Sequence, residues 1–159
     1  MADALETISS SISRISQQVS ALEKARDLLT GKLLPGVDKK VSERSPGVSI
    51  RGMKIESENG DVKVINAATG TGGYATRINL KNPGFHCTCP DFEKRQRACK
   101  HVIALASQAV EKIETTIEDM VDTSNGFTEH LKSLESSLNR LAMESEQAVA
   151  FYDSVSKVL

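Results

Sequence analysis

The 159-residue chain has no tryptophan, and aromatic side chains make up only 4% of it. A core with so few large side chains argues against the roomy pocket that an enzyme or a small-molecule binder needs. There is no run of eighteen apolar residues and no charged-then-apolar leader, so we expect neither a membrane span nor secretion. Three cysteines, an odd number, disfavour a disulfide framework. Reduced thiols fit an intracellular compartment, either the cytoplasm or the nucleus or nucleoid.

Neither sign of charge dominates, because the formal net charge is only −1. The charges are nevertheless unevenly distributed along the chain. Residues 1–34 are neutral, residues 35–101 carry a net charge of +5, and residues 102–159 carry −6. The whole protein is therefore not expected to bind nucleic acid through its bulk charge, but its middle part could.

All three cysteines and one of the three histidines lie between residues 87 and 101, in the order C-x-C, nine residues, C-x-H. Three thiols and one imidazole match the ligand set of a closed, four-coordinate structural zinc site. Sulfur is a soft donor that favours zinc over magnesium or calcium. We predict that Cys87, Cys89, Cys99 and His101 hold one structural zinc ion. Four protein ligands leave no open position for activating water, so we expect no enzymatic activity.

Two other interpretations of these residues stay open. The thiols could form one disulfide plus a spare cysteine, or they could be inert core residues. On a strand, Cys87 and Cys89 would face the same side, which suits a shared metal better than two unrelated buried cysteines. His86 is the rival ligand nearby, but on the same strand it would point away from Cys87.

The context of the motif adds a resemblance. Pro90-Asp91-Phe92 follows the second cysteine, and Cys99-Lys100-His101 opens into the apolar run 102–106. Over about residues 48–106 the chain resembles a SWIM zinc finger. The resemblance implies a small antiparallel sheet leading into the first two cysteines and a helix opening at the C-x-H pair. It also implies a non-catalytic module of DNA-associated or protein-interaction settings, including subunits that accompany RecA-like recombinase paralogs.

Before this region, residues 2–30 are predicted to form one helix with apolar residues in alternating steps of three and four, interrupted only at Arg26. This heptad series consists of Leu5, Ile8, Ile12, Ile15, Val19, Leu22 and Leu29. Gly31 is the expected C-terminal stop. The segment 35–47 is expected to be a linker.

A β region follows. Residues 49–56 alternate as a strand, Glu58-Asn59-Gly60-Asp61 predicts a hairpin turn, and Val62 and Val64 mark the returning strand. Residues 67–73 are expected to form a flexible, glycine-rich hairpin loop. Further strands are predicted at 74–80, with Thr76, Ile78 and Leu80 on one face, and at 85–89.

From Val102 the chain is predicted to be helical to its end, with a heptad series that contains only two polar members, Ser124 and Ser145. The series is Ile103, Ala106, Val110, Ile113, Ile117, Met120, Ser124, Phe127, Leu131, Leu134, Leu138, Leu141, Ser145, Ala148, Tyr152, Val155 and Leu159. The helix either runs unbroken through Asn125-Gly126 or folds back there as an αα-hairpin. The cost of glycine in a helix favours an interruption or kink near 124–126.

The expected fold class is α+β: a small antiparallel sheet with a Cys3His zinc site, flanked by long N- and C-terminal heptad helices in a bundle or coiled coil. We expect four parts, 1–34, 35–47, 48–106 and 107–159. The apolar stripe is wide enough for a bundle of three or four helices. The helices could be only the core that a small zinc unit lacks, or they could bind a protein partner or a second copy of the chain.

Basic residues cluster around the motif, and the segment from Pro90 to Lys100 carries a net charge of +2. These residues could contact phosphates of DNA or RNA. These candidate contacts are Lys81, Lys94, Arg95, Arg97 and Lys100. Only Phe92 could stack on a base nearby, so base-specific binding is not supported. Three hypotheses remain: a nucleic-acid-associated zinc adaptor, a protein–protein module, and a helical scaffold whose zinc unit is purely structural.

Overall fold

The computed structural model describes residues 2–157, so Val158 and Leu159, at the end of the heptad series, lie outside it. The fold is α+β, as expected, with one four-stranded antiparallel sheet and long helices near both termini. The chain divides into two compact units, a core unit of residues 15–121 and a terminal unit of residues 1–14 and 122–159. The four-part division expected from the sequence is a different one and stays a prediction.

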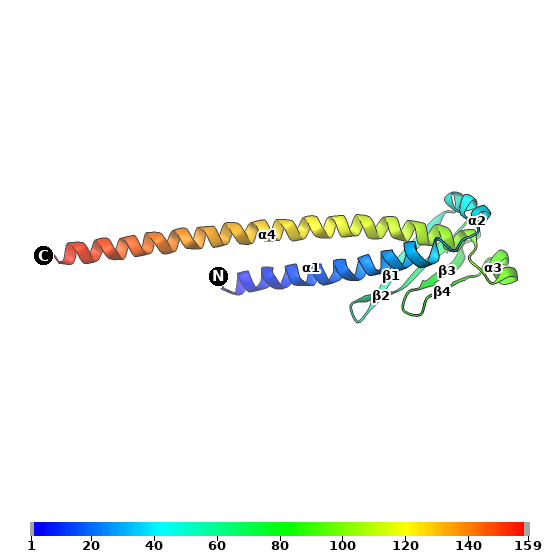
Figure 1. Cartoon of the computed structure of the whole chain (residues 1–159), viewed down its shortest axis with the longest axis horizontal. Coiled ribbons are helices and arrows are strands. Elements are labelled where there is room, and N and C mark those ends of the chain that lie inside the picture. The colour runs from blue at the N-terminus through cyan, green and yellow to red at the C-terminus, as the bar shows by residue number, and fades with distance from the viewer. Residues whose placement is uncertain (1, 158–159) are drawn as a thin grey trace. The chain divides into compact units, whose positions relative to one another are not determined.

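The sheet is built from four strands in chain order, β1-β2-β3-β4 (Figure 1). The strands are β1 (Ile50–Glu58), β2 (Asp61–Thr69), β3 (Tyr74–Asn79) and β4 (Gly84–Cys87). The predicted hairpin turn joins β1 to β2, and both Asn59 (φ 53°) and Gly60 (φ 82°) adopt the left-handed conformation that a type I′ turn requires. β2 is longer than expected, because residues 67–69 belong to the strand and only residues 70–73 form the turn.

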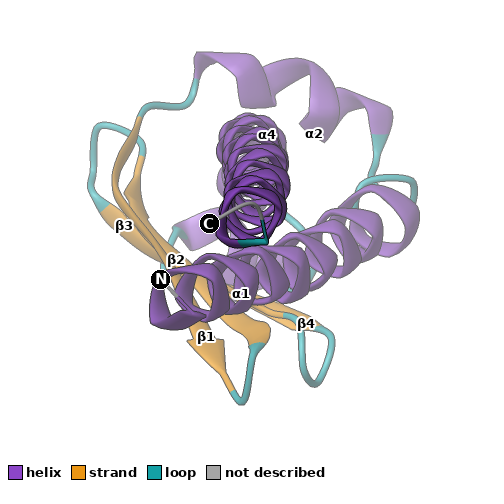
Figure 2. Cartoon of the chain, turned by 90° about the vertical axis from the view of Figure 1, so that its left-hand side faces the viewer, coloured by secondary structure: helices purple, strands orange, loops and turns teal. Residues whose placement is uncertain are grey.

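One face of the sheet carries the hydrophobic core of this unit. Ile65, Ala67 and Ile78 pack in one buried cluster with Ala25 and Leu29 from the N-terminal segment and with the first five turns of the last helix (Figure 2). Thr76, Ile78 and Leu80 are all buried on this face, as the alternation predicted. The helical residues of the same cluster are Val102, Leu105, Ala106, Ala109, Ile113 and Ile117.

The N-terminal helix α1 (Ala2–Leu28) does not end at Gly31 as expected, because it continues as one π-helical turn, η1 (Leu29–Leu33). The Leu34 amide donates to the Leu29 carbonyl at 3.0 Å, the wider spacing of a π turn. Leu29 is completely buried. Packing of this side chain in the core holds the extra turn, so the glycine lies within the helical segment and does not terminate it.

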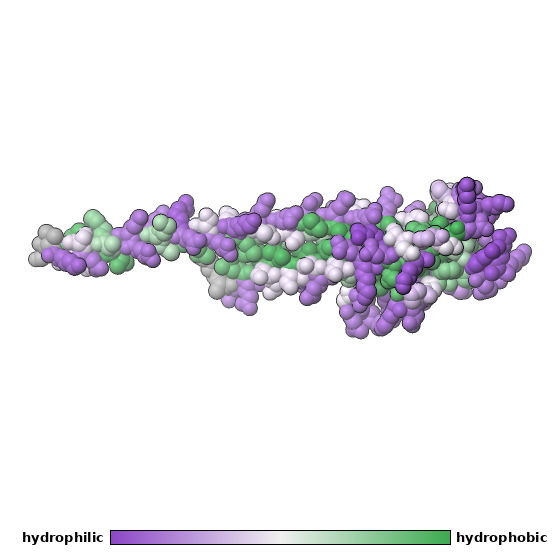
Figure 3. All heavy atoms as spheres, in the orientation of Figure 1, coloured by the Kyte–Doolittle hydropathy of each residue, from purple (hydrophilic) through white to green (hydrophobic). Residues whose placement is uncertain are grey.

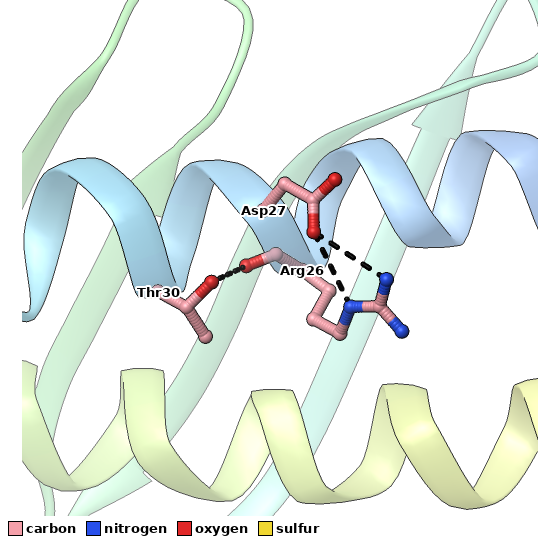
Figure 4. Close-up of polar contacts among 3 residues, drawn as sticks. All are labelled: Arg26, Asp27 and Thr30. Carbon is pink, nitrogen blue, oxygen red and sulfur yellow. Dashed lines mark hydrogen bonds and ion pairs between the residues drawn. The ribbon is translucent and has the colours of Figure 1, made fainter.

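Arg26, the residue that breaks the N-terminal heptad series, is half-buried and keeps its charge paired. Its Nε and Nη2 atoms each lie 3.4 Å from Asp27 Oδ1, and the Thr30 hydroxyl donates to the Arg26 carbonyl at 2.9 Å (Figure 4). The stem of the arginine can cover apolar surface while its head reaches an acid on the same helix. A charged residue in this series is therefore tolerated.

The segment expected as a linker contains a short helix, α2 (Lys39–Arg44), followed by a 3-10 turn, η2 (Ser45–Gly47). The Asp38 side chain caps α2 by accepting the Lys40 amide at 2.9 Å. Val41 and Ser45 are buried. An aspartate cap before two lysines was the signal in the sequence for this helix.

The last helix, α4 (Lys100–Ser156), runs without a break through Asn125 and Gly126. The interruption expected there is therefore wrong, whereas a kink at this point stays a prediction. The apolar phase is the same on both sides of the two residues, and the Thr128 hydroxyl donates to the Ser124 carbonyl one turn earlier at 3.0 Å. Coiled-coil pairing of α1 and α4 stays a prediction. Among the described helices, none combines the length and apolar character needed to cross a membrane.

We predict that Gly126→Ala stabilises the protein by roughly 0.5–1 kcal/mol, because alanine loses less conformational entropy than glycine when it becomes part of a helix. A methyl group at this position meets no atom within 4 Å. The measurement is urea unfolding followed by circular dichroism at 222 nm. Gly36→Ala, at another open position outside the helices, is the control. Destabilisation by Gly126→Ala alone would show that the helix is interrupted here.

Candidate metal centre

The four predicted ligands come from three consecutive elements that meet at one end of the sheet. Cys87 is the last residue of β4, and Cys89 is the N-cap of a short helix, α3 (Pro90–Arg95). Cys99 lies directly before α4, and its carbonyl accepts the Ile103 amide at 3.2 Å, so it caps that helix. His101 is in the first turn of α4, as predicted. The C-x-C and C-x-H pairs therefore join a strand end to two helix starts.

The side chains converge into one buried cluster. One ligand atom from each of Cys87, Cys89, Cys99 and His101 lies within 4.8 Å of all the others. The three cysteines are at most 1% exposed, and His101 is 6% exposed. Tetrahedral zinc with bonds of about 2.3 Å needs sulfurs about 3.8 Å apart, so a contraction of about 1 Å or less completes the site. The arrangement is thus compatible with one zinc ion in a closed, four-ligand site.

The protonation of the thiols points to a cluster that is prepared for a cation. The pKa of Cys87 falls to about 5, chiefly because the Cys99 thiol donates to it, while burial opposes this shift. The pKa of Cys99 is raised by the same hydrogen bond and by burial. Burial is also the main cause that raises the pKa of Cys89. Hydrogen bonding within the cluster thus favours the charged form of Cys87, and a metal dication would stabilise all three sulfurs as thiolates.

Backbone amides also point at the sulfurs. Cys89 Sγ accepts the Phe92 amide at 3.4 Å, at the N-terminus of α3. The Cys89 amide donates to the Cys87 sulfur and lowers its pKa. The Val102 amide has the same effect on the pKa of Cys99. N–H groups at a helix start favour negative charge, so the fold itself supports thiolates at these positions.

Two buried threonines support Cys87 from the sheet. The Thr76 hydroxyl donates to Cys87 Sγ at 3.4 Å, and it lies 2.7 Å from the hydroxyl of Thr69. Thr76 and Cys87 are cross-strand partners on β3 and β4. Such a donor fixes the orientation of the sulfur and stabilises its charged form. The hydrophobic-alternation pattern identified Thr76 as an inward residue but gave no sign of this contact.

His101 is held in place by the turn between β2 and β3. Its Nδ1 atom faces Cys99 Sγ at 3.8 Å, and its ring packs against Tyr74 with ring centres 5.0 Å apart. Burial lowers the pKa of His101, which favours the neutral, metal-binding form. A Cβ atom at Gly70 would lie only 2.9 Å from His101 Nε2. The turn expected to be a flexible loop is therefore one wall of the site.

His86, the rival ligand, is exposed and belongs to the opposite face of β4. Its ring contacts Phe92 edge-on, with the ring centres 5.3 Å apart. Among the described residues, the metal-type cluster contains His101 and not His86.

The structure separates one of the five candidate nucleic-acid contacts from the others. Lys81 lies in the turn between β3 and β4, at the end of the hairpin away from Cys87, and pairs with Glu58 at 3.1 Å. That pair, together with Lys63, lowers the pKa of Glu58. The remaining four lie between the ligands in the chain: Lys94 and Arg95 on α3, Arg97 in the following loop and Lys100 at the start of α4. Arg95 pairs with Asp91 at 3.1 Å, whereas Lys94, Arg97 and Lys100 form no ion pair within residues 2–157.

Three buried thiols and a buried imidazole between a strand end and two helix starts form a candidate Cys3His metal site. In a comparison with known protein families, residues 78–109 match the sequence model of the SWIM zinc finger. The resemblance seen in the sequence is thus confirmed for this segment, which covers about a fifth of the chain. Comparison with curated proteins and with solved structures gave no match.

We predict that Gly70→Ala weakens zinc binding at least tenfold, because the added methyl group displaces the His101 ring. The zinc dissociation constant is measured by competition with a chromophoric chelator. Gly60→Ala is the matched control, since Gly60 has a similar positive φ but open space around it. Both variants carry the backbone cost of a left-handed alanine, about 1–2 kcal/mol. Equal zinc affinities for the two variants would contradict this role of Gly70.

Proposed function

We propose that the chain is a non-catalytic zinc-binding adaptor whose SWIM zinc finger contacts nucleic acid. The single observation that carries the proposal is the buried Cys87, Cys89, Cys99 and His101 cluster inside a segment that matches the SWIM family. Zinc is the favoured ion because three of the four donors are soft sulfurs. A zinc ion bound by all four side chains is closed to water and therefore structural.

The metal would supply rigidity where the polypeptide has little of its own. Between the second and third cysteines the chain forms only the two turns of α3, and Gln96 follows in the left-handed conformation (φ 51°). Phe92 is the buried apolar anchor of this helix. Zinc binding would tie β4, α3 and α4 together, and much of the folding free energy of this region would come from it.

Unpaired cations on this rigid loop support contact with phosphates. Lys94, Arg97 and Lys100 are exposed and have no ion pair among the described residues. Side chains of this kind bind the nucleic-acid backbone without reading bases, with an affinity that falls as salt rises. Arg95 is partly neutralised by Asp91 and would contribute less.

The test is salt-dependent binding of the zinc-loaded chain to labelled DNA and RNA. We expect Lys94→Gln/Arg97→Gln to weaken binding at every sequence, and to reduce the slope of log K against log salt by about 0.9 for each lost contact with duplex. Lys112→Gln/Lys132→Gln on α4 changes the net charge equally and should bind like the parent protein.

Zinc content is measured for each variant, so that loss of binding is not confused with loss of the metal. If the parent protein binds neither DNA nor RNA at low salt, or the two charge variants bind alike, the loop is not a nucleic-acid contact. A zinc-loaded protein that still recruits a protein partner would then favour the alternative, a subunit that accompanies a RecA-like recombinase paralog.

The far part of α4 supports a second role, assembly with another copy of the chain. Most of the heptad residues between 141 and 155 are exposed, with Leu141 52%, Tyr152 73% and Val155 43% accessible. Figure 3 shows apolar residues exposed among hydrophilic ones toward this end of the helix. Exposed apolar side chains that continue a heptad series are typical of helices that pair.

We expect the parent protein to self-associate and Leu141→Ser/Tyr152→Ser to shift it to monomer in sedimentation equilibrium. Met143→Ser is the control, because Met143 is also exposed (61%) but lies outside the heptad series. A parent protein that is monomeric at all concentrations tested would leave a different protein as the partner of this surface.

A further inference from the structure

The face of the sheet that points away from the core is open to solvent and basic. Along β1 the exposed side chains of this face are Arg51, Lys54 and Glu56, along β3 they are Ala75 and Arg77, and on β4 the exposed one is His86. None of these residues belongs to the hydrophobic cluster that fills the other face. The proposed function uses the zinc loop and leaves this face without a role.

The strand register places four polar side chains of this face in a straight line across the sheet. Lys54 pairs with Asn66, Asn66 with Arg77, and Arg77 with His86. We call these four residues the outer row. Three strand spacings of about 4.8 Å separate its ends, so the row is about 14 Å long. Two register shifts between β1 and β2, one between Arg51 and Lys54 and one between Glu56 and Ser57, lie on either side of the row, and the pairing is regular from Lys54 to Glu56.

The cations of the outer row are not neutralised by the protein. Lys54 and Arg77 form no ion pair among residues 2–157, and Arg51 in the neighbouring row reaches only the Gly70 carbonyl, at 3.5 Å. The acid closest in register is Glu56, one row away. Val64, which lies on this same face, is nevertheless only 1% exposed. One buried position on this face leaves the three cations Arg51, Lys54 and Arg77 exposed.

The outer row ends beside α3, the helix of the zinc loop. His86 at its end contacts Phe92, with ring centres 5.3 Å apart. Phe92 is the buried anchor of α3, and the exposed Lys94 lies two residues further along that helix. Residues two apart point to different sides of a helix, so this contact does not join the zinc-loop cations to those of the sheet.

The chemistry of this surface fits a phosphate backbone better than a protein partner. Apart from His86 it has no aromatic side chain, and interfaces between proteins are enriched in aromatic anchors. The row beside it carries Ala68 and Ala75, whose short side chains leave the cations accessible. Without a stacking platform, single-stranded bases gain little here, so a duplex is the better match.

We propose that the exposed face of the β-sheet binds the phosphate backbone of a nucleic-acid duplex through Arg51, Lys54 and Arg77. This rests on the proposed function for the nature of the ligand, but it assigns the main contact to residues outside the zinc loop. The zinc loop is then a second, separate contact with the nucleic acid.

The test compares three variants of the full zinc-loaded chain, each lacking two positive charges, in binding to a fluorescent 20-base-pair duplex. They are Lys54→Gln/Arg77→Gln on the sheet, Lys94→Gln/Arg97→Gln on the zinc loop, and Lys39→Gln/Lys40→Gln on α2. Helix α2 lies across α4 from the sheet and serves as the control (Figures 1 and 2). Glutamine removes the charge but keeps a long polar side chain at these exposed positions, so we expect the fold to be retained. Zinc content and circular dichroism check this.

We expect the sheet variant to bind about tenfold more weakly at about 0.1 M salt, with a salt slope about 1.8 lower, while the control matches the parent protein. If the sheet variant binds like the control and the loop variant does not, the inference is wrong and the proposed function stands. If the parent protein binds no duplex, the inference is wrong as well. Tighter binding to single strands than to duplex, or a change in self-association instead of duplex binding, would also overturn it.

Discussion

The burial of three thiols and one imidazole in a single cluster is the constraint on which the rest of the core unit depends. Charge on a buried sulfur is costly unless a cation or hydrogen-bond donors compensate it. Here the donors are visible: amides at two helix starts and the hydroxyl of Thr76. A metal dication would complete the compensation. Strand β4, helix α3 and helix α4 all begin or end at this point, so the path of the chain is determined there.

The sheet next to the cluster has two faces with different side chains. Its inner face buries apolar residues against α1 and α4, and its outer face presents cations in register. Side chains alternate along a strand, so the register that places Thr76 and Cys87 on the inner face also places Arg77 and His86 on the outer face. The metal cluster and the basic face are therefore two sides of the same strand pair, and the position of one fixes the orientation of the other.

Much of this could be predicted from the sequence, because the signals are local. The ligand spacing, the Asn59-Gly60 turn and the alternation around Ile78 each depend on a few neighbouring residues. What could not be predicted depends on contacts between distant segments. Gly70 was expected to be part of a flexible loop, since nothing near it in sequence shows that His101 lies against it. The alignment of Lys54 with Arg77 depends on the pairing of three strands through Asn66, which no local signal in the sequence shows. The continuity of α4 through Gly126 depends on the apolar phase of the whole helix, which outweighs a local preference of about 1 kcal/mol.

X-ray absorption at the zinc edge, together with elemental analysis of the purified chain, tests the central claim most directly. The account predicts one zinc ion per chain with three sulfur neighbours at about 2.3 Å and one nitrogen neighbour at about 2.0–2.1 Å. Substoichiometric zinc, or a coordination shell in which oxygen replaces sulfur or nitrogen, would contradict it.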